Sequence, residues 1–299
     1  MMGAFAAVAS AALWAFASTR YAQASRAVGS ARVNLTRATT VLPIFLVVTL
    51  VSTRGHVLAG IDGTRAGWLG LSVLCAYGFA DNVFFAAARR VGITTALAIA
   101  SSYPLWAAFV GTLWRGEHFG VVRAGGTLLC VGGIIALIVL SPRAVEDHAH
   151  AHSTKRDARE GILLALLTSL LWAGNTVSVK MGGTGIDAWQ ANLIRFFIAW
   201  PILAATSALI ARPTKDDAVA RAAYRGLVPV SVAEACVGSS LFVYGLAHTD
   251  LAVGATLSSL APLLSVPFAL FYQEERWSPP RFAAVTATVA GVVILIVGA

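Results

Sequence analysis

Long apolar stretches alternate with short polar segments along nearly the whole chain. A helix needs about 20 apolar residues to cross the hydrocarbon core of a bilayer. The stretches are continuous and rich in Ala, Leu and Val, without the alternation typical of strands in a membrane barrel. The pattern predicts an all-α integral membrane protein with ten transmembrane helices, at about 3–19, 36–52, 66–88, 92–114, 120–140, 161–180, 189–211, 225–246, 251–272 and 279–298.

One polar segment is long enough to be a linker. Residues 141–160 read SPRAVEDHAHAHSTKRDARE, with no apolar periodicity. At the other end of the first half, residues 1–9 contain no Lys or Arg, so the first apolar stretch lacks the basic region that begins a secretory signal. We therefore expect it to be the first helix of the fold.

The chain repeats itself at an offset of 158 residues. The offset predicts a first five-helix repeat at 1–140, a polar linker at 141–160 and a second five-helix repeat at 161–299. Because five is odd, the second repeat must enter the membrane upside down, an architecture associated with secondary transporters. The aligned pairs are Trp14 with Trp172, Asn34 with Asn192, Arg37 with Arg195, Pro43 with Pro201, Phe84 with Phe242, Ser101 with Ser259, Pro104 with Pro262, Glu117 with Glu275 and Gly133 with Gly291.

Composition excludes several classes of protein. The 299 residues are 58% hydrophobic and 12% charged, with a mean hydropathy of +0.75. These values exclude a soluble globular domain, a disordered chain and a nucleic-acid binder with a charged surface. The net charge of +8 is then charge in loops at a membrane, and the three cysteines, which lie in apolar runs, are expected to be reduced.

The repeated motifs resemble those of the drug/metabolite transporter superfamily, in particular its ten-helix EamA-type members. The features that carry the resemblance are the Trp in helices 1 and 6, the Arg in helices 2 and 7, the Pro in helices 4 and 9 and the Glu after each of those helices. The resemblance covers nearly the whole chain. It implies a transporter with both termini in the cytoplasm and with helices 5 and 10 packed together, their contact formed by Gly125, Gly126, Gly132, Gly133 and Gly291.

The distribution of basic residues favours the opposite orientation. Sixteen Lys and Arg residues fall on the face that holds the linker, and six fall on the face that holds both termini. The positive-inside rule then places both termini outside the cell. The two arguments disagree, and the size of the charge bias favours the second.

Two acids lie near the middle of predicted helices, where a charge costs about 2.5–3.5 kcal/mol by insertion scales. Asp81 lies in helix 3 and Glu234 in helix 8, yet the offset aligns them with Ser239 and Ala76. The repeat alone does not require them, so we expect them to line a polar cavity and bind a cationic group or a proton, with Tyr77 one turn from Asp81. The alternative is that each acid pairs with Arg37, Arg195 or Lys180, or is hydrogen-bonded between helices.

Pro104 and Pro262 lie in the middle of helices 4 and 9. Each removes a backbone hydrogen bond to the carbonyl four residues earlier. Such a break is tolerated where neighbours or water satisfy the carbonyl. We expect kinks that line the cavity and bend during switching, or alternatively static packing kinks, with these neighbours: Ser101, Ser102, Tyr103, Ser258 and Ser259.

Several further side chains are candidates for the site. Trp14 and Trp172 lie mid-span, away from the interfaces where Trp is enriched, and either wall the pathway or pack helices. Asn175 is expected to face the cavity, and Lys180 to reach the surface. Arg37 and Arg195 are expected to orient their helices or hold gate carboxylates rather than touch substrate.

No catalytic, metal or cofactor site is predicted. The tract Asp147–His152 contains three alternating His, which is only a compositional hint of metal binding, and a solvated linker is the favoured interpretation. The chain has no phosphate-cradling Gly loop, H-E-x-x-H or C-x-x-C motif, and no loop large enough for a nucleotide domain.

These observations together favour a multi-pass secondary transporter of the cell inner (plasma) membrane. It would move a small polar metabolite by alternating access, with a cationic or zwitterionic substrate favoured, export more common among relatives, and proton coupling as a hypothesis. Its partners would be the small-molecule substrate and the lipid bilayer, not nucleic acid, and it would be a monomer or homodimer. The alternatives are an integral-membrane enzyme or lipid-carrier protein, and a passive channel.

Overall fold

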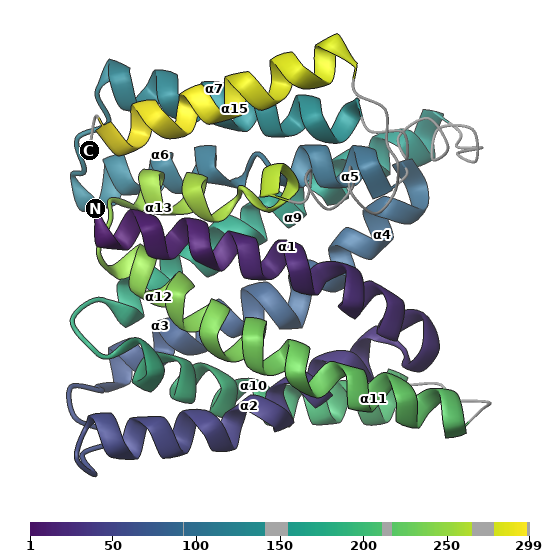
Figure 1. Ribbon diagram of the computed structural model, residues 1–299, viewed down its shortest axis with the longest axis vertical. Helices are drawn as coiled ribbons and strands as arrows, with labels where there is room; N and C mark the ends of the chain where they lie inside the picture. Colours follow the sequence, from purple (N-terminus) through teal and green to yellow (C-terminus); the bar gives the residue numbers. More distant parts are fainter. Residues whose placement is uncertain (92, 141–154, 211–216, 265–277, 298–299) are drawn as a thin grey trace.

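The computed structural model describes residues 1–91, 93–140, 155–210, 217–264 and 278–297. Within these ranges the chain is helical apart from short turns. The elements, shown in Figure 1, are α1 (Met2–Val28), α2 (Ser30–Ser52), α3 (Gly63–Val73), the π-helix η1 (Leu74–Ala80), α4 (Asp81–Val91), α5 (Ile93–Ala100), α6 (Tyr103–Arg115), α7 (Val121–Val139), α9 (Lys155–Gly183), α10 (Ala188–Ile210), α11 (Asp217–Ser231), the π-helix η2 (Val232–Gly238), α12 (Ser239–Ala247), α13 (Leu251–Ser258) and α15 (Pro279–Val297).

The predicted all-α membrane fold is confirmed. Nine helical stretches in the described ranges are long and apolar enough to cross a membrane, and a shorter apolar helix, Leu251–Leu264, occupies the start of the ninth predicted span. Helix α9 begins at Lys155, so the last six residues of the predicted linker are helical. Most of that linker, including the His tract, lies outside the described residues.

The 158-residue offset reappears in the bounds of the helices. Both ends of α10 lie 158 residues after those of α2, and the same holds for α15 and α7 and for α13 and α5. The two π-helices also correspond, since η1 begins at Leu74 and η2 at Val232. Two copies of one local pattern therefore fold into two copies of one helical unit, even where the helix departs from α geometry.

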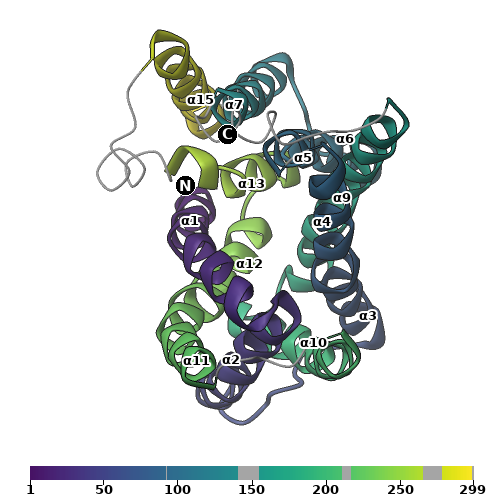
Figure 2. The same cartoon turned by 90° about the vertical axis from the view of Figure 1, so that its right-hand side faces the viewer.

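The repeats interlock through their first and third spans. Helix α1 packs against α11, η2 and α12 of the second repeat, and α9 packs against α3, η1 and α4 of the first. Figure 2 shows these two groups facing each other across the molecule. The pairs α2–α10 and α7–α15 lie at opposite ends of the bundle. Because each group combines helices from both repeats, the two repeats meet in the interior of the molecule.

Helices α7 and α15 approach closely along glycines. A Cβ added to Gly291 would lie 2.5 Å from the backbone nitrogen of Cys130, and one added to Gly126 would lie 2.9 Å from Ile294. Gly133 meets Thr288 in the same way, whereas Gly125 and Gly132 have nothing within 4 Å. Three of the five predicted packing glycines therefore lie in this interface, and two face away from it.

Both chain ends lie at the same face of the bundle (Figure 1). We call this face the termini side and the opposite face, where α9 begins, the linker side. Polar contacts fasten the termini side: Glu117 Oε2 accepts a hydrogen bond from the Leu251 backbone nitrogen at 2.7 Å, and Arg123 pairs with Asp250. The turn before α13 is thus held by the turn between α6 and α7.

Lys180 contributes to the same fastening, so the expectation that it reaches the surface is wrong. Its side chain is buried, and Nζ donates a hydrogen bond to the Thr249 carbonyl. The turn between α12 and α13 supplies the acceptor for its ammonium group inside the protein.

Candidate functional site

An ion pair between the repeats occupies the interior. Arg37 of α2 donates from its NH2 nitrogen to Glu234 Oε2 in η2 at 2.8 Å. The hydroxyl of Tyr21 in α1 donates to the same oxygen at 2.9 Å. Arg37 is 5% exposed and Glu234 is 7% exposed. Of the arrangements that the sequence left open for Glu234, the structure has the one in which it is paired with Arg37.

The second predicted acid joins this ion pair through an amide. Asn34 Nδ2 donates to Asp81 Oδ2 at 3.2 Å, and Arg37 NH1 donates to Asn34 Oδ1 at 3.3 Å. Asn34 lies one helical turn before Arg37 on α2 and shares its face. It was not among the predicted site residues, although the repeat had aligned it with Asn192.

Aromatic rings surround the Arg37 guanidinium. Its central carbon lies 4.3 Å from the centroid of the Tyr21 ring, and 5.6 Å from those of Trp14 and Tyr77. A cation is attracted to the face of such rings. Trp14 is 44% exposed. We call Arg37, Glu234, Asp81, Asn34 and Tyr21 the first cluster; with both acids ionised it carries one net negative charge.

The π-helices position the acids. Glu234 lies within η2, Tyr77 lies within η1, and Asp81 is the first residue after η1. A π-helical turn is rare, and such turns are frequent at functional sites. No periodicity in the sequence had indicated them, because apolar residues on these spans fit an ordinary helix equally well.

Arg195, the repeat counterpart of Arg37, has different neighbours. Its Nε donates to Ser72 Oγ at 2.9 Å, NH1 donates to Asn192 Oδ1 at 2.9 Å and NH2 donates to Asn175 Oδ1 at 3.3 Å. The side chain is 4% exposed. No carboxylate in the described ranges forms an ion pair with it. We call Arg195, Ser72, Asn192 and Asn175 the second cluster; its acceptors are all neutral.

Trp172 belongs to a separate aromatic group. Its ring is stacked on Phe84 at 5.9 Å between centroids and meets Tyr103 edge-on at 6.1 Å. The Tyr103 hydroxyl donates to the Ala255 carbonyl at 3.1 Å, which joins α6 to α13. Trp14 and Trp172 therefore belong to different groups, Trp14 beside Arg37 and Trp172 beside the break between α5 and α6.

The fourth predicted span is broken rather than bent. Helix α5 ends at Ala100, α6 begins at Tyr103, and Pro104 is a buried residue of its first turn. The backbone nitrogen of Ser101 still donates to Leu97, at 2.9 Å. Ser102 Oγ donates to the Ile99 carbonyl at 2.7 Å and lies 3.0 Å from Ser169 Oγ of α9. The predicted mid-helix Pro thus starts a new helix.

The ninth span ends its first helix at the equivalent position. Helix α13 ends at Ser258, and Ser259 Oγ donates to the Thr256 carbonyl at 2.7 Å. Ser258 Oγ is buried without a hydrogen-bond partner. Pro262 lies in the short helical turn 261–264 that follows. Both predicted prolines therefore follow interruptions at repeat-equivalent places.

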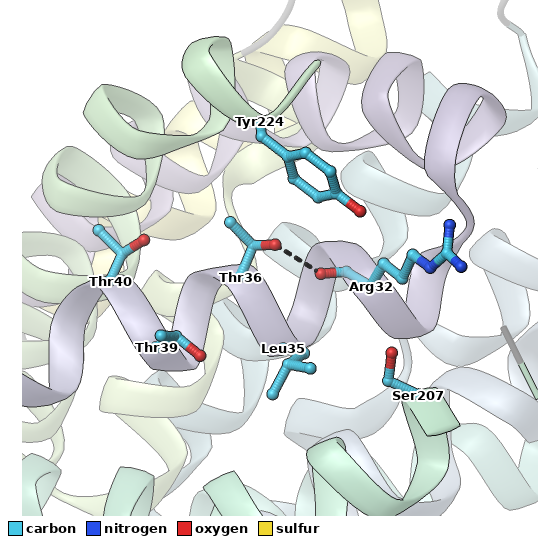
Figure 3. A pocket seen from close by; sticks show the side chains of 7 residues that line it. All are labelled: Arg32, Leu35, Thr36, Thr39, Thr40, Ser207 and Tyr224. Atoms are coloured by element: carbon cyan, nitrogen blue, oxygen red, sulfur yellow. Dashed lines mark hydrogen bonds between the residues drawn. The ribbon is translucent and has the colours of Figure 1, made fainter. Parts of the chain in front are cut away.

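A pocket outside these clusters lies beside α2 (Figure 3). It has a volume of about 360 Å³. Thr36 Oγ1 donates to the Arg32 carbonyl at 2.8 Å along its wall. No residue predicted for the site contributes to its lining, which consists of Arg32, Leu35, Thr36, Thr39, Thr40, Ser207 and Tyr224.

The sequence contains three cysteines and six histidines, residue types that can hold a metal ion. No group of three or more His, Cys, Asp or Glu side chains is placed to hold an ion in the part of the chain that the structure describes. Cys75, Cys130 and Cys236 are free thiols.

Comparison with known proteins agrees with the two-repeat arrangement. The model of a family described as "EamA-like transporter family" matches residues 1–139 and 159–297. A solved structure described only as "Crystal structure of protein" is similar in fold, with a TM-score of 0.77 and 17% identity over 99% of this chain and 96% of that chain. None of the curated proteins matches this sequence.

Proposed function

Because the chain belongs to the EamA-like transporter family of the drug/metabolite transporter superfamily, we propose that it is a secondary active transporter that moves a small polar metabolite by alternating access. The membrane is proposed to be the cell inner (plasma) membrane, and export the direction. The chain is a multi-pass membrane protein, as its apolar helices indicate. The coupling energy would come from an ion gradient, and the hypothesis for the ion is a proton.

The observation that carries the proposal is the buried ion pair between Arg37 and Glu234. The two residues come from different repeats and are 2.8 Å apart inside the bundle. Removing charges from water is costly, so a membrane protein retains buried charges mainly along substrate and ion pathways. An ion pair at the boundary between inverted repeats is suited to break and re-form as the repeats move against each other.

The broken fourth and ninth spans support the same proposal. The interruptions after Ala100 and Ser258 lie at equivalent places in the two repeats, where a hinge in each would serve the switch. Irregular backbone inside a membrane is tolerated where it is buried in protein or lines a water-filled cavity. Two equivalent hinges allow the two repeats to exchange conformations, which would open the interior to one side and then the other.

The first cluster favours a cationic or zwitterionic substrate. Its single net negative charge, contributed by Asp81 beyond the Arg37–Glu234 pair, would attract a cationic group. Trp14 and Tyr77 add aromatic faces next to that charge. An amine or a proton would thus have a defined place beside Asp81.

Purified protein in liposomes tests the proposal. A screen of small metabolites by thermal shift, repeated on Glu234→Gln and Asp81→Asn, first finds a ligand that stabilises the native protein and not a variant. Counterflow with that ligand is then expected to saturate, which separates a transporter from a channel. Uptake that ignores both the pH gradient and Glu234→Gln would remove proton coupling, and a ligand consumed by the protein would identify an enzyme instead.

A further inference from the structure

The two repeats place the same Arg–Asn pair in different charge surroundings, acidic in the first and neutral in the second. Arg37 and Asn34 face Glu234 and Asp81, whereas Arg195 and Asn192 face only neutral acceptors in the described ranges. The sequence explains the difference, because the positions 158 residues from the two acids are Ala76 and Ser239. The second arginine keeps the hydrogen bond of the first to the asparagine three residues earlier, without its counter-charge.

A guanidinium in this position lacks compensation for its burial. Arg195 lies about 10 Å along α10, at a rise of 1.5 Å per residue, and is 4% exposed. Breaking or omitting one partner of a buried ion pair leaves an uncompensated charge, which is strongly unfavourable. Neutral amide and hydroxyl oxygens satisfy hydrogen bonds and do not cancel the charge. An anion that enters the interior would therefore gain more at Arg195 than at Arg37.

The Arg195 guanidinium also has N–H groups that none of these hydrogen bonds uses. It carries five N–H groups, and its described hydrogen bonds to Ser72, Asn192 and Asn175 use one from each nitrogen. One N–H therefore remains on each terminal nitrogen. Two N–H groups of one guanidinium can bind both oxygens of a carboxylate in parallel, which matches the planar shape of that group.

We propose that Arg195 binds a carboxylate group of the transported substrate, with Asn175 and Asn192 holding the guanidinium in place. The proposal rests on the proposed transport function and assigns the anionic end of the substrate. The cationic end then belongs to Asp81 in the first cluster, so the substrate is a zwitterion rather than a simple cation. The Tyr77 ring lies beside the first cluster, 5.6 Å from the Arg37 guanidinium, and 6.1 Å from the ring of Phe196, which follows Arg195 in the chain.

Two probes of the same shape test the site. Benzoate and benzamide share a planar ring and differ in charge. Each is added at millimolar concentration to purified protein in detergent, with sodium chloride holding the ionic strength constant, and the melting temperature is measured. Benzoate is expected to raise the melting temperature by several degrees, and benzamide is expected to leave it unchanged.

Three variants locate the effect. Asn175→Asp places a carboxylate on the atom that already accepts from Arg195, so it is expected to raise the melting temperature of the free protein and to abolish the benzoate shift. Arg195→Gln is expected to abolish the shift as well. Lys180→Gln removes the same amount of charge from another buried side chain and is expected to keep the shift, because Lys180 bonds to the Thr249 carbonyl and not to the second cluster.

The outcomes decide between the site and the transporter. Absence of a benzoate shift in the native protein, or a shift that survives Asn175→Asp, overturns the carboxylate site. Loss of the shift in Lys180→Gln overturns it too, because the effect would then follow net charge. Saturable counterflow by a metabolite without a carboxylate, at a rate unaffected by Asn175→Asp, would reject the site and leave the transport proposal standing.

Discussion

Arg37 and Glu234 are 197 positions apart in the chain and 2.8 Å apart in space. The pair joins α2 of the first repeat to η2 of the second, and Tyr21 of α1 completes it. Its repeat counterpart does not exist, because Ala76 stands where a second Glu would be. The interior is therefore symmetric in its helices and asymmetric in its charge, and this asymmetry gives the proposed site its two different ends.

Breaking the ion pair on one side should cost more than removing both partners. Arg37→Gln and Glu234→Gln each leave a buried charge alone, for which about 3–5 kcal/mol is a usual cost. The double variant removes both charges and should recover part of that loss. Thermal unfolding of the four proteins measures the coupling; losses that simply add would mean that the pair does not act as a unit.

The repeat-equivalent asparagines should respond in opposite directions to one substitution. Asn34→Asp brings a third carboxylate against Asp81 and should lower the melting temperature. Asn192→Asp gives Arg195 its missing counter-charge and should raise the melting temperature. The gain is reduced by the loss of the hydrogen bond that Asn192 donates to Ser240 at 3.3 Å. Each variant is the control for the other. Shifts of the same sign would contradict the charge asymmetry.

The Tyr21 hydroxyl should have a modest effect of its own. Tyr21→Phe removes the 2.9 Å hydrogen bond to Glu234 and leaves the ring over Arg37. A hydrogen bond to a charged group contributes about 1.5–3 kcal/mol, so the melting temperature should fall by less than in Glu234→Gln. Tyr224→Phe, in the pocket beside α2 (Figure 3), serves as the control and should change the melting temperature little.

Glycines of α7 and α15 should divide by the face they occupy. Gly291→Ala forces a methyl group against the backbone of Cys130 and should destabilise the protein by about 1–3 kcal/mol, as overpacking usually does. Gly125→Ala meets nothing within 4 Å and should stabilise the helix by up to about 1 kcal/mol. Unfolding measured side by side tests the interface; equal effects would place both glycines in the same environment.

The repeat could be predicted because the pairs that the offset aligns include residue types that seldom match by chance. Trp14 with Trp172 and Arg37 with Arg195 fix one offset, and the helix bounds follow that offset. The spans could be predicted because a bilayer requires long apolar stretches. The resemblance to EamA-type transporters, drawn from the same residues, is confirmed by the family match.

The details of the site could not be predicted because they depend on which side chains meet. Glu234 had three basic candidates, and only the packing of η2 against α2 selects Arg37. The π-helices and the break before Pro104 change the direction of a helix without changing its apolar pattern. Lys180 was expected at the surface because its length allows it, and a nearby carbonyl decides otherwise.

Alternating access requires the interior of the protein to open to one side of the membrane at a time, which labelling from each side measures. In a variant free of native cysteines, Arg123→Cys and Asp250→Cys are joined by a reducible bifunctional thiol reagent, which keeps α7 and the start of α13 together on the termini side. A third substitution, Tyr77→Cys, carries a protecting group that is removed after the cross-link has formed. Its labelling by a membrane-impermeant thiol reagent, in membrane vesicles of either orientation, reports from which side the interior of the protein is accessible. The locked protein is expected to react from the linker side only, and reduction of the lock is expected to restore reaction from both sides. Reaction from both sides at unchanged rates while the lock is in place would rule out alternating access.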